Sequence, residues 1–237
     1  MSLSSCDISI VIPVYNEQKL LAESTTTLCH QLDALGWDYE LLLAENGSTD
    51  DTIEVGRRLE KEHARVSLFS VDQPNYGLAL RTGILRARGA LVLCDEIDLC
   101  DINFHQRARE ILDSGGTDMV IGSKAMPGSA DHRPIFRRVA TRVLNGMLRI
   151  ALDFQGTDTH GLKAFKREAL LDVVESCVID RDIFASELVV RAYRSGIRIV
   201  EIPVHVSEKR RTTIHLVRRV PNVIKNLARL TYVIRMK

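Results

Sequence analysis

The stretch "LVLCDEIDLC", residues 91–100, joins an apolar run to a cluster of acids. Its first four residues form the kind of continuous apolar segment that becomes a buried strand. Asp95, Glu96, Asp98 and Asp101 then follow within seven residues. Carboxylates this close repel one another, which raises their pKa values unless a cation lies among them. Because acids at strand ends also cap helices, the stretch predicts a core strand that ends at a cation site or at a helix cap.

Asp101 fits the second of these roles. It directly precedes a segment with helical spacing that ends near residue 113, and Asp is a favoured residue at the position before a helix. We therefore expect Asp101 to cap that helix and the other three acids to be available to a ligand.

Strand-like and helix-like segments alternate outward from this stretch. Strands are predicted at 8–15, 39–46, 65–71, 90–94 and 118–122. Helical segments between them give the spacing of β-α-β units, which is typical of a mostly parallel sheet with helices on both faces. In such sheets ligands bind at the carboxyl ends of the strands. The acids after residue 94 are predicted to lie at one of these ends.

The second half of the chain is less regular. A basic amphipathic helix is predicted at about 135–150, a short strand within 157–168, a helix at 184–195 and a strand at 197–206. A last helix is predicted from Pro221, with the proline in its first turn. One side of that helix carries the apolar residues Val220, Val223, Ile224, Leu227, Leu230, Val233 and Ile234.

Charge is unevenly distributed along the 237 residues. The formal net charge is +1, but residues 209–237 hold nine Lys or Arg and no acid, which leaves −8 for the first 208 residues. The basic tail predicts an anionic partner such as a phosphate or a membrane surface. Its apolar stripe could equally pack on the core or on a second subunit, which would make a homodimer. Nucleic-acid binding is not expected, because Tyr232 is the one aromatic residue in the tail.

The cysteines and the apolar segments bear on the compartment. Five scattered cysteines without a C-x-x-C pair favour a reducing environment over a disulfide framework. No segment has the roughly 18 apolar residues that a transmembrane helix needs, and the start of the chain lacks a signal-peptide pattern. We expect a cytoplasmic protein that is peripheral, if at all, on the inner face of the membrane.

Seven short segments together carry a family pattern. They are "VIPVYNE" (11–17), "ENGSTDDT" (45–52), "NYGLALRTGI" (75–84), "EID" (96–98), "IGSK" (121–124), "DTHGLKAFKRE" (158–168) and "EIPVHVSEKRRTTIHL" (201–216). In this order they resemble the motifs of family 2 glycosyltransferases of the GT-A fold, most of all the dolichyl- and polyprenyl-phosphate sugar synthases. The resemblance implies a single Rossmann-like α/β domain over 1–216, with a nucleotide-sugar half to about 101 and an acceptor half to about 216. The basic amphipathic C-terminal helix, 217–237, would follow it.

Several positions depart from the family pattern. Glu45 and Asn46 replace its usual pair of aspartates after the second strand, and Glu96 replaces the first Asp of its D-x-D metal motif. Glu keeps the charge but reaches one methylene further. Lys209 and His215 stand where the family usually has Arg and Lys. These changes leave the fold and the donor class as implied, and leave the sugar and the acceptor open.

The resemblance implies roles for particular residues. Glu96 and Asp98 would bind Mg²⁺ or Mn²⁺, with Asp95 as a rival ligand; strand alternation would place Glu96 and Asp98 on one face. Asp98 and Asp158 would be catalytic. The nucleotide sugar would contact Pro13, Tyr15, Glu17, Glu45, Asn46, Gly47, Ser48, Gly77 and Asp95. An acceptor phosphate would contact Lys124, Arg137, Lys163, Lys209 and His215.

The implied reaction is inverting, metal-dependent transfer of a sugar from a nucleotide-diphosphate sugar, and a polyprenyl phosphate is the favoured acceptor. A lipid phosphate is already ionised and needs no base, whereas a sugar or natural-product hydroxyl would need one, for which Asp158 is the candidate. A soluble enzyme acting on such a hydroxyl is therefore an alternative. So is a non-catalytic homologue that binds nucleotide sugars, given the altered acidic motifs. A sugar-nucleotide pyrophosphorylase is not expected, because a Gly-rich triphosphate loop is absent after the first strand.

Overall fold

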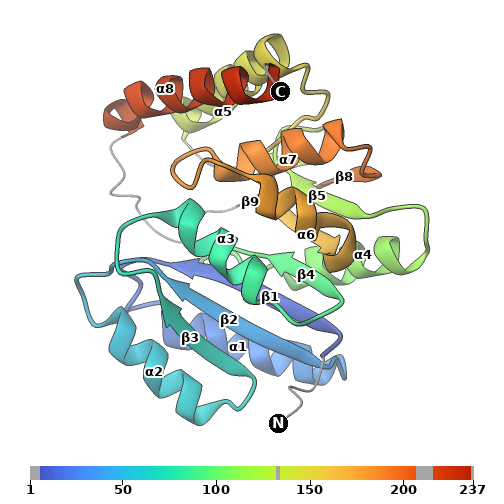
Figure 1. Cartoon of the computed structure of the whole chain (residues 1–237). Coiled ribbons are helices and arrows are strands. Elements are labelled where there is room, and N and C mark those ends of the chain that lie inside the picture. Colours follow the sequence, from blue (N-terminus) through green and yellow to red (C-terminus); the bar gives the residue numbers. More distant parts are fainter. Residues whose placement is uncertain (1–5, 132–133, 207–215, 236–237) are drawn as a thin grey trace.

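The computed structural model describes residues 6–131, 134–206 and 216–235. A seven-stranded sheet runs through its centre in the order β3-β2-β1-β4-β7-β5-β8 (Figure 1). The strands are β1 (Ile8–Val14), β2 (Tyr39–Glu45), β3 (Val66–Ser70), β4 (Leu91–Cys94), β5 (Met119–Ser123), β7 (Leu162–Lys166) and β8 (Ile199–Pro203). Among these strands β7 runs antiparallel to its neighbours and the other pairings are parallel. The short strands β6 (Ala130–Asp131) and β9 (His205–Val206) form a separate parallel pair.

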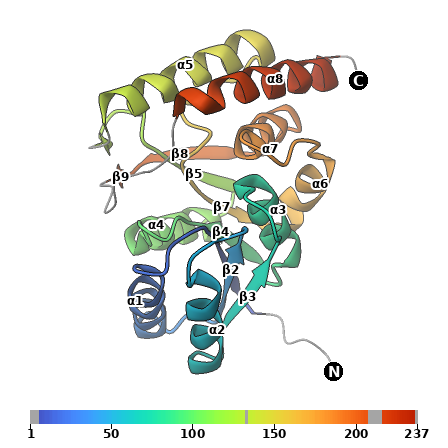
Figure 2. The same ribbon diagram turned by 90° about the vertical axis from the view of Figure 1, so that its left-hand side faces the viewer.

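Helices cover both faces of the sheet (Figures 1 and 2). One face holds α1 (Leu21–Ala34), α2 (Thr52–Glu62) and α4 (Ile102–Asp113), and the other holds α3 (Tyr76–Arg86), α6 (Arg167–Ser176) and α7 (Phe184–Arg194). The remaining helices, α5 (Ile135–Leu152) and α8 (Leu216–Arg235), lie together beyond β5 and β8.

Side-chain alternation on the strands explains this layering. Ile10 and Ile12 of β1 pack toward α1 and α4, whereas Val11 packs toward α3. A strand with helices on both faces is apolar along its whole length. Every residue of β1, β2 and β4 is buried, as this arrangement requires.

The predicted mostly parallel α/β sheet is confirmed, and the first five strands lie within two residues of their predicted bounds. The strand predicted at 197–206 is divided into β8, which pairs with β5, and β9, which pairs with β6 in the separate two-stranded sheet. Helix α6 was not predicted. Asp101 caps α4 as expected, accepting hydrogen bonds from the backbone N–H groups of Asn103 and Phe104.

The predicted start of the C-terminal helix was wrong, and the prediction had left open what its apolar stripe packs against. Helix α8 begins at Leu216, so Pro221 lies inside the helix and not in its first turn. A proline removes a single amide donor, which the helix tolerates here. The apolar stripe packs largely on the core, with Leu227 and Leu230 buried. In the described part of the chain no helix has the length and hydropathy needed to cross a bilayer.

Candidate active site

The predicted site residues within the described part of the chain lie mainly along one edge of the sheet, where parallel strands end. Val14 and Glu45 are paired at the ends of β1 and β2, and Cys94 ends β4 beside Val11. Antiparallel β7 begins at this edge, where Lys163 pairs with Cys94. The loops of the predicted donor half and acceptor half therefore meet around the end of β4.

Two loops on the donor side are held together by short polar contacts. The backbone N–H of Asn16 donates to Oγ of Ser48 over 3.0 Å, and Oδ1 of Asn16 accepts from the N–H of Thr49 over 2.8 Å. The N–H of Glu17 donates to Oγ1 of Thr52 over 2.7 Å. These bonds fix the turn that follows β1 and carries Tyr15, which is 42% exposed.

Glu45 and Asn46 face inward at the end of β2. Oε1 of Glu45 accepts from the N–H of Ser48 and Oε2 accepts from the hydroxyl of Ser70. Nδ2 of Asn46 donates to the carbonyl of Val14 over 2.8 Å. Both side chains therefore fix the turn in which Gly47 has a φ of 74°, a backbone conformation that suits glycine. Their predicted contacts with a nucleotide stay predictions.

Asp95 organises the acidic loop. Its Oδ1 accepts from the N–H of Glu96 over 2.6 Å, and its Oδ2 accepts from the N–H of Asp101 over 3.1 Å. Nε2 of His105, on α4, lies 2.6 Å from the same Oδ2. β4 ends at Cys94, so the strand-alternation argument for Glu96 and Asp98 was wrong, because these residues lie in a turn.

Asp98 is buried close to other acids. Burial and the neighbouring Glu96 carboxylate raise the pKa of Asp98 to about 6, against the opposing charge of Arg137. Carboxylates whose charges repel suit a divalent cation with oxygen ligands. Glu96 and Asp98 offer such oxygens, although no three His, Cys, Asp or Glu side chains of the described residues converge as a metal-binding group. A metal here would need ligands from the substrate.

Asp158 forms the centre of the acceptor side. Its Oδ2 accepts from the N–H of Lys124 over 3.1 Å and its Oδ1 from the N–H of His160 over 2.8 Å. Burial would raise the pKa of Asp158, but the Lys124 ammonium and these N–H groups outweigh it and hold the pKa below its ordinary value. Burial lowers the pKa of His160 to about 4, so its imidazole is neutral at pH 7.

Two lysines are buried beside Asp158. Nζ of Lys124 donates to the carbonyl of His160 over 3.0 Å, and Nζ of Lys163 donates to the carbonyl of Gly161 over 2.7 Å. Burial lowers the pKa of Lys163, while the carboxylates of Asp158 and Glu96 act in the opposite direction. Lys209 and His215, the other predicted acceptor residues, lie outside the described residues.

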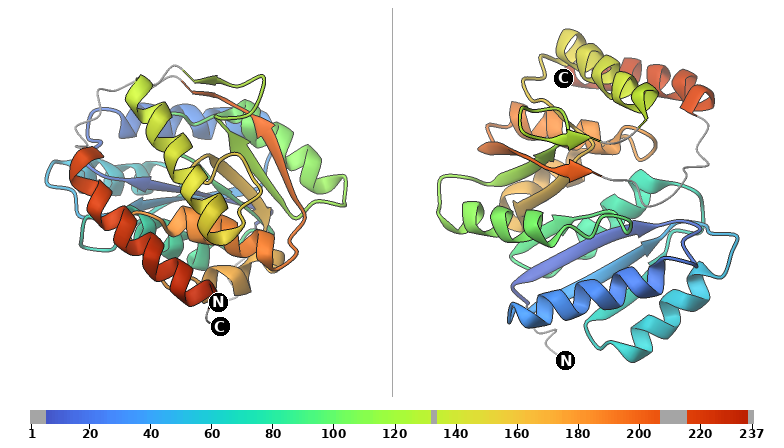
Figure 3. Two further views of the ribbon diagram at one scale, coloured as in Figure 1. Left: turned by 90° about the horizontal axis from the view of Figure 1, so that it is seen from above. Right: turned by 180° about the vertical axis from the view of Figure 1, so that it is seen from behind.

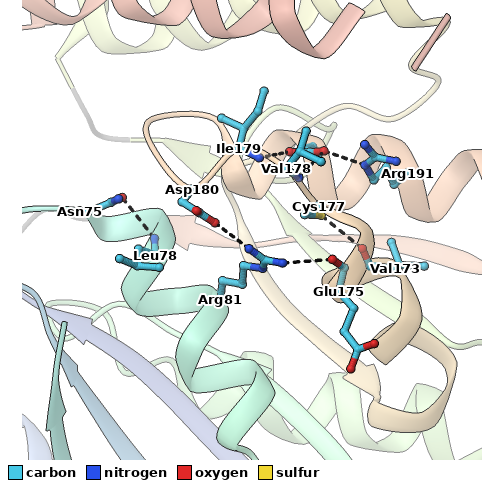
Figure 4. Close-up of polar contacts among 11 residues, drawn as sticks. Asn75, Leu78, Arg81, Val173, Glu175, Cys177, Val178, Ile179, Asp180 and Arg191 are labelled. Carbon is cyan, nitrogen blue, oxygen red and sulfur yellow. Dashed lines mark hydrogen bonds and ion pairs between the residues drawn. The ribbon is translucent and has the colours of Figure 1, made fainter. Parts of the chain in front are cut away.

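Gly77 allows close packing between the start of α3 and the loop that follows α6. A Cβ on Gly77 would lie 2.2 Å from the carbonyl oxygen of Asp180, so the start of α3 packs directly on the loop between α6 and α7. Figure 4 shows Arg81 of α3 reaching the Asp180 carboxylate, 3.0 Å away, and the backbone of Glu175. The predicted contact of Gly77 with a nucleotide stays a prediction.

Two functional-site neighbours were not found from sequence. His105 contacts Asp95 from a helix, and Glu201 of β8 accepts from the N–H of Thr157 over 2.8 Å, next to Asp158. The single usable signal was the "EIP" motif, which contains Glu201 but does not by itself indicate a role for that residue. A histidine in an amphipathic helix carries no sign of its tertiary partner.

Comparison with known proteins matches this arrangement to a family. The model of the family "Glycosyl transferase family 2" matches residues 9–173. The chain belongs to glycosyl transferase family 2. This family 2 chain is 33% identical over 217 residues to glycosyltransferase AglD of Haloferax volcanii, covering 90% of this chain and 35% of AglD, so it spans about a third of that relative.

Other relatives of this family 2 chain are closer to it in length. An uncharacterized glycosyltransferase of Mycobacterium tuberculosis is 32% identical over 198 residues, 83% of this chain and 84% of that protein. Dolichyl-phosphate beta-glucosyltransferase ALG5A of Trichomonas vaginalis is 27% identical over 220 residues, 86% of this chain and 67% of that protein.

A solved structure shares the fold. Glucosyl-3-phosphoglycerate synthase from Mycobacterium tuberculosis, in complex with Mn²⁺, UDP-glucose and phosphoglyceric acid, superposes with a TM-score of 0.69 at 20% identity. The superposition covers 95% of this chain and 80% of that one. The predicted GT-A-like α/β fold is confirmed.

Proposed function

We propose that this chain transfers a hexosyl group, with inversion, from a nucleotide-diphosphate sugar to a polyprenyl phosphate. The observation that carries the proposal is the meeting of two opposite charge clusters at one edge of the sheet. Glu96 and Asp98 lie at the end of β4, and the buried cations Lys124 and Lys163 lie close by around Asp158. In this reaction the donor diphosphate and the acceptor phosphate lie on either side of the transferred sugar. A metal held by the acids would neutralise the first, and the buried lysines would neutralise the second.

The donor would bind at the ends of β1 and β2. Tyr15 and Glu17 lie at the turn that would receive the base and ribose, and the diphosphate would extend toward the acidic loop. Glu96 and Asp98 would hold Mg²⁺ or Mn²⁺. The chemistry supplied by either ion is neutralisation of the charge that develops on the departing diphosphate. That a solved structural neighbour holds Mn²⁺ with UDP-glucose supports this assignment and makes UDP the first nucleotide to test.

The state of Asp158 favours a phosphate acceptor. A phosphate oxygen would attack the anomeric carbon as the bond from that carbon to the diphosphate breaks, and no proton needs to be removed. A hydroxyl acceptor would need a base with a pKa near the working pH. Asp158 has a lowered pKa and both oxygens already accept N–H groups, so it is a weak base. Asp158 would instead position Lys124 and the loop beside the acceptor.

A small anionic molecule with a hydroxyl is the second candidate acceptor. The observation that favours it is the phosphoglyceric acid bound to the structural neighbour. Lys124, Lys163 and Arg137 would serve the anionic group of either acceptor, so the two candidates share their binding residues. They differ in solubility and in the need for a base.

Two measurements test the proposal. Thermal melting with UDP, GDP, CDP and dTDP, each with and without Mn²⁺ or Mg²⁺, identifies the nucleotide, because a ligand of the folded state raises the melting temperature. Transfer of labelled sugar from the matching donor is then measured on dolichyl phosphate, undecaprenyl phosphate and phosphoglyceric acid. Label in the lipid phase, absent for an Asp98→Asn variant, is the expected result. Label on phosphoglyceric acid alone would contradict the lipid acceptor, and no nucleotide binding would favour a non-catalytic homologue.

A further inference from the structure

Helix α5 carries apolar side chains on two opposite sides. Leu148 and Leu152 face the core and are buried. The other side exposes a stripe that we call the α5 outer face: Ile135, Phe136, Val139, Val143 and Ile150. These residues recur at helical spacing, and Phe136 and Ile150 are 60% and 84% exposed. A contiguous exposed apolar stripe of this kind marks an interaction site.

The neighbouring helix also exposes apolar side chains. Helix α8 lies alongside α5 at the same end of the molecule (Figures 1 and 3), and Nε of Arg235 donates to the carbonyl of Ala151 over 2.9 Å. On α8, Val220 and Ile224 are at least half exposed, and Tyr232 is exposed further along the same helix. Together the two helices hold eight of the large apolar side chains that are exposed in the described part of the chain.

The charges on the two helices have one sign. α5 contains four arginines and α8 contains five Lys or Arg, and neither helix contains Asp or Glu. Arg138 and Arg142 lie one turn apart beside the α5 outer face. A second copy docked on this face by two-fold symmetry would bring the same cations toward one another. An occupant with negative charge around an apolar interior fits better.

We propose that the α5 outer face, with α8 beside it, docks on the surface of a bilayer that contains anionic lipids. Apolar side chains flanked by arginines are the pattern of a helix that lies in the plane of a membrane surface. The apolar residues enter the acyl boundary, and the guanidinium groups stay at the level of the phosphates. The occupant is the lipid surface itself. The inner side of α8 is not part of the contact, because it packs on the core through Val223, Leu227, Leu230 and Ile234.

The inner side of α5 connects this surface to the candidate active site. Nδ2 of Asn145 donates to the carbonyl of Thr157 over 2.7 Å, and the Arg149 guanidinium donates to the carbonyl of Gly156 over 3.0 Å. Asp158 follows in the same loop. Docking would therefore hold the bilayer next to the acceptor side of the site. That consequence rests on the proposed function, whereas docking itself does not.

Vesicle co-sedimentation of the full chain tests the docking. Vesicles of phosphatidylcholine alone are compared with vesicles that also contain phosphatidylglycerol. The double variant Phe136→Ser with Val143→Ser should lower the partition coefficient onto anionic vesicles by about tenfold, and Arg142→Glu by about fivefold to tenfold. Matched controls on exposed positions of other helices, Ile53→Ser with Leu85→Ser and Arg57→Glu, should leave it unchanged. Circular dichroism confirms that each variant is folded.

The possible outcomes distinguish a bilayer from a second copy of the chain as the occupant of the α5 outer face. They also distinguish failure of the docking from failure of the proposed acceptor. A wild-type chain that stays in the supernatant with anionic vesicles, or a double variant that sediments like wild type, would overturn the docking. A wild-type dimer that the double variant dissociates, without any change in vesicle binding, would assign the face to a second copy. A short-chain isoprenyl phosphate in solution needs no bilayer, so the double variant should turn it over at the wild-type rate. If the wild-type chain does not transfer sugar to that phosphate, the proposed acceptor is wrong, and the result of the vesicle experiment is unaffected.

Discussion

Nε2 of His105 lies 2.6 Å from Oδ2 of Asp95, and neither side chain is exposed to solvent. Because Asp95 also accepts the N–H groups of Glu96 and Asp101, this contact ties the acidic loop to α4. His105→Phe should remove one of the three partners of a buried carboxylate and lower the free energy of unfolding by about 1–3 kcal/mol. It should also weaken binding of nucleotide with Mn²⁺. Chemical denaturation and calorimetry measure the two effects.

The matched control for His105→Phe is His30→Phe, the same change at an exposed position of α1. That variant should leave both measurements at their wild-type values. Equal stability of the His105 and His30 variants would mean that the contact does not position the loop.

Asp98 should make the stability of the protein depend on pH. Its folded pKa is raised to about 6, above the unfolded value, so the folded state binds the extra proton. The stabilisation is present below pH 4 and is lost as the pH rises through 6, by up to about 3 kcal/mol. Asp98→Asn should therefore raise the melting temperature of the metal-free protein at pH 7.5 and have little effect at pH 4. The same variant should abolish the further stabilisation by Mn²⁺ with nucleotide.

A control for Asp98→Asn is Asp113→Asn, at an exposed carboxylate at the end of α4. Its effect on melting should be small at both pH values. If Asp98→Asn instead destabilised the metal-free protein at pH 7.5, the carboxylate would be held by favourable contacts and the repulsion argument would be wrong.

The sequence predicted the fold correctly where the pattern of apolar residues is compatible with only one kind of element. Strands β1, β2 and β4 are apolar without interruption because helices cover both faces, and this pattern is visible in one dimension. The start of α8 was misplaced because a proline is allowed both at the start of a helix and, at the loss of one hydrogen bond, within it. Such a choice depends on the tertiary packing of Leu227 and Leu230 against the core.

The site was predicted as a set of positions and not as a set of contacts. Motif order placed Glu96, Asp98, Asp158 and Lys163 in the site, and the structure brings them together through the pairing of β4 with β7. What sequence could not give is the direction in which each side chain points. Glu45 has the residue type of a ligand-binding acid, yet both its oxygens bind groups of the protein.

Gly77 should tolerate no side chain. A Cβ there would lie 2.2 Å from the carbonyl oxygen of Asp180 and 2.8 Å from Cβ of Phe184, and backbone cannot yield as a flexible side chain can. Gly77→Ala should lower the free energy of unfolding by about 1–3 kcal/mol through overpacking. It should also displace the loop that holds Arg81 (Figure 4). Thermal melting is the measurement.

Gly146→Ala is the matched control for Gly77→Ala, and it should raise the stability of the protein. Gly146 lies within α5 with no atom near the site of a Cβ, so alanine should stabilise the helix by about 1 kcal/mol. A Gly77→Ala variant that melts at or above the wild-type temperature would show that the α6–α7 loop can move away from α3.

Lys163 serves the acceptor in the proposed site, but its charge should also contribute to the binding of the donor diphosphate, because it lies near Glu96 as well as Asp158. Its ammonium is buried at the start of β7, near the carboxylates of Glu96 and Asp158, with one hydrogen bond to the carbonyl of Gly161. Lys163→Met conserves most of the volume and removes the positive charge. We expect affinity for the nucleoside diphosphate to fall about tenfold, which corresponds to about 1.4 kcal/mol. The loss should be larger without Mn²⁺ than with it, because the metal supplies part of the same neutralisation.

Calorimetry with and without Mn²⁺ measures this loss, and Lys166→Met is the matched control. Lys166 ends the same strand, is partly exposed and pairs with Leu91 at the far end of β4. The control should bind nucleotide as the wild type does. Equal affinities for Lys163→Met and the wild type would place the diphosphate away from β7, and the proposed convergence of donor and acceptor phosphates at this edge of the sheet would then fail.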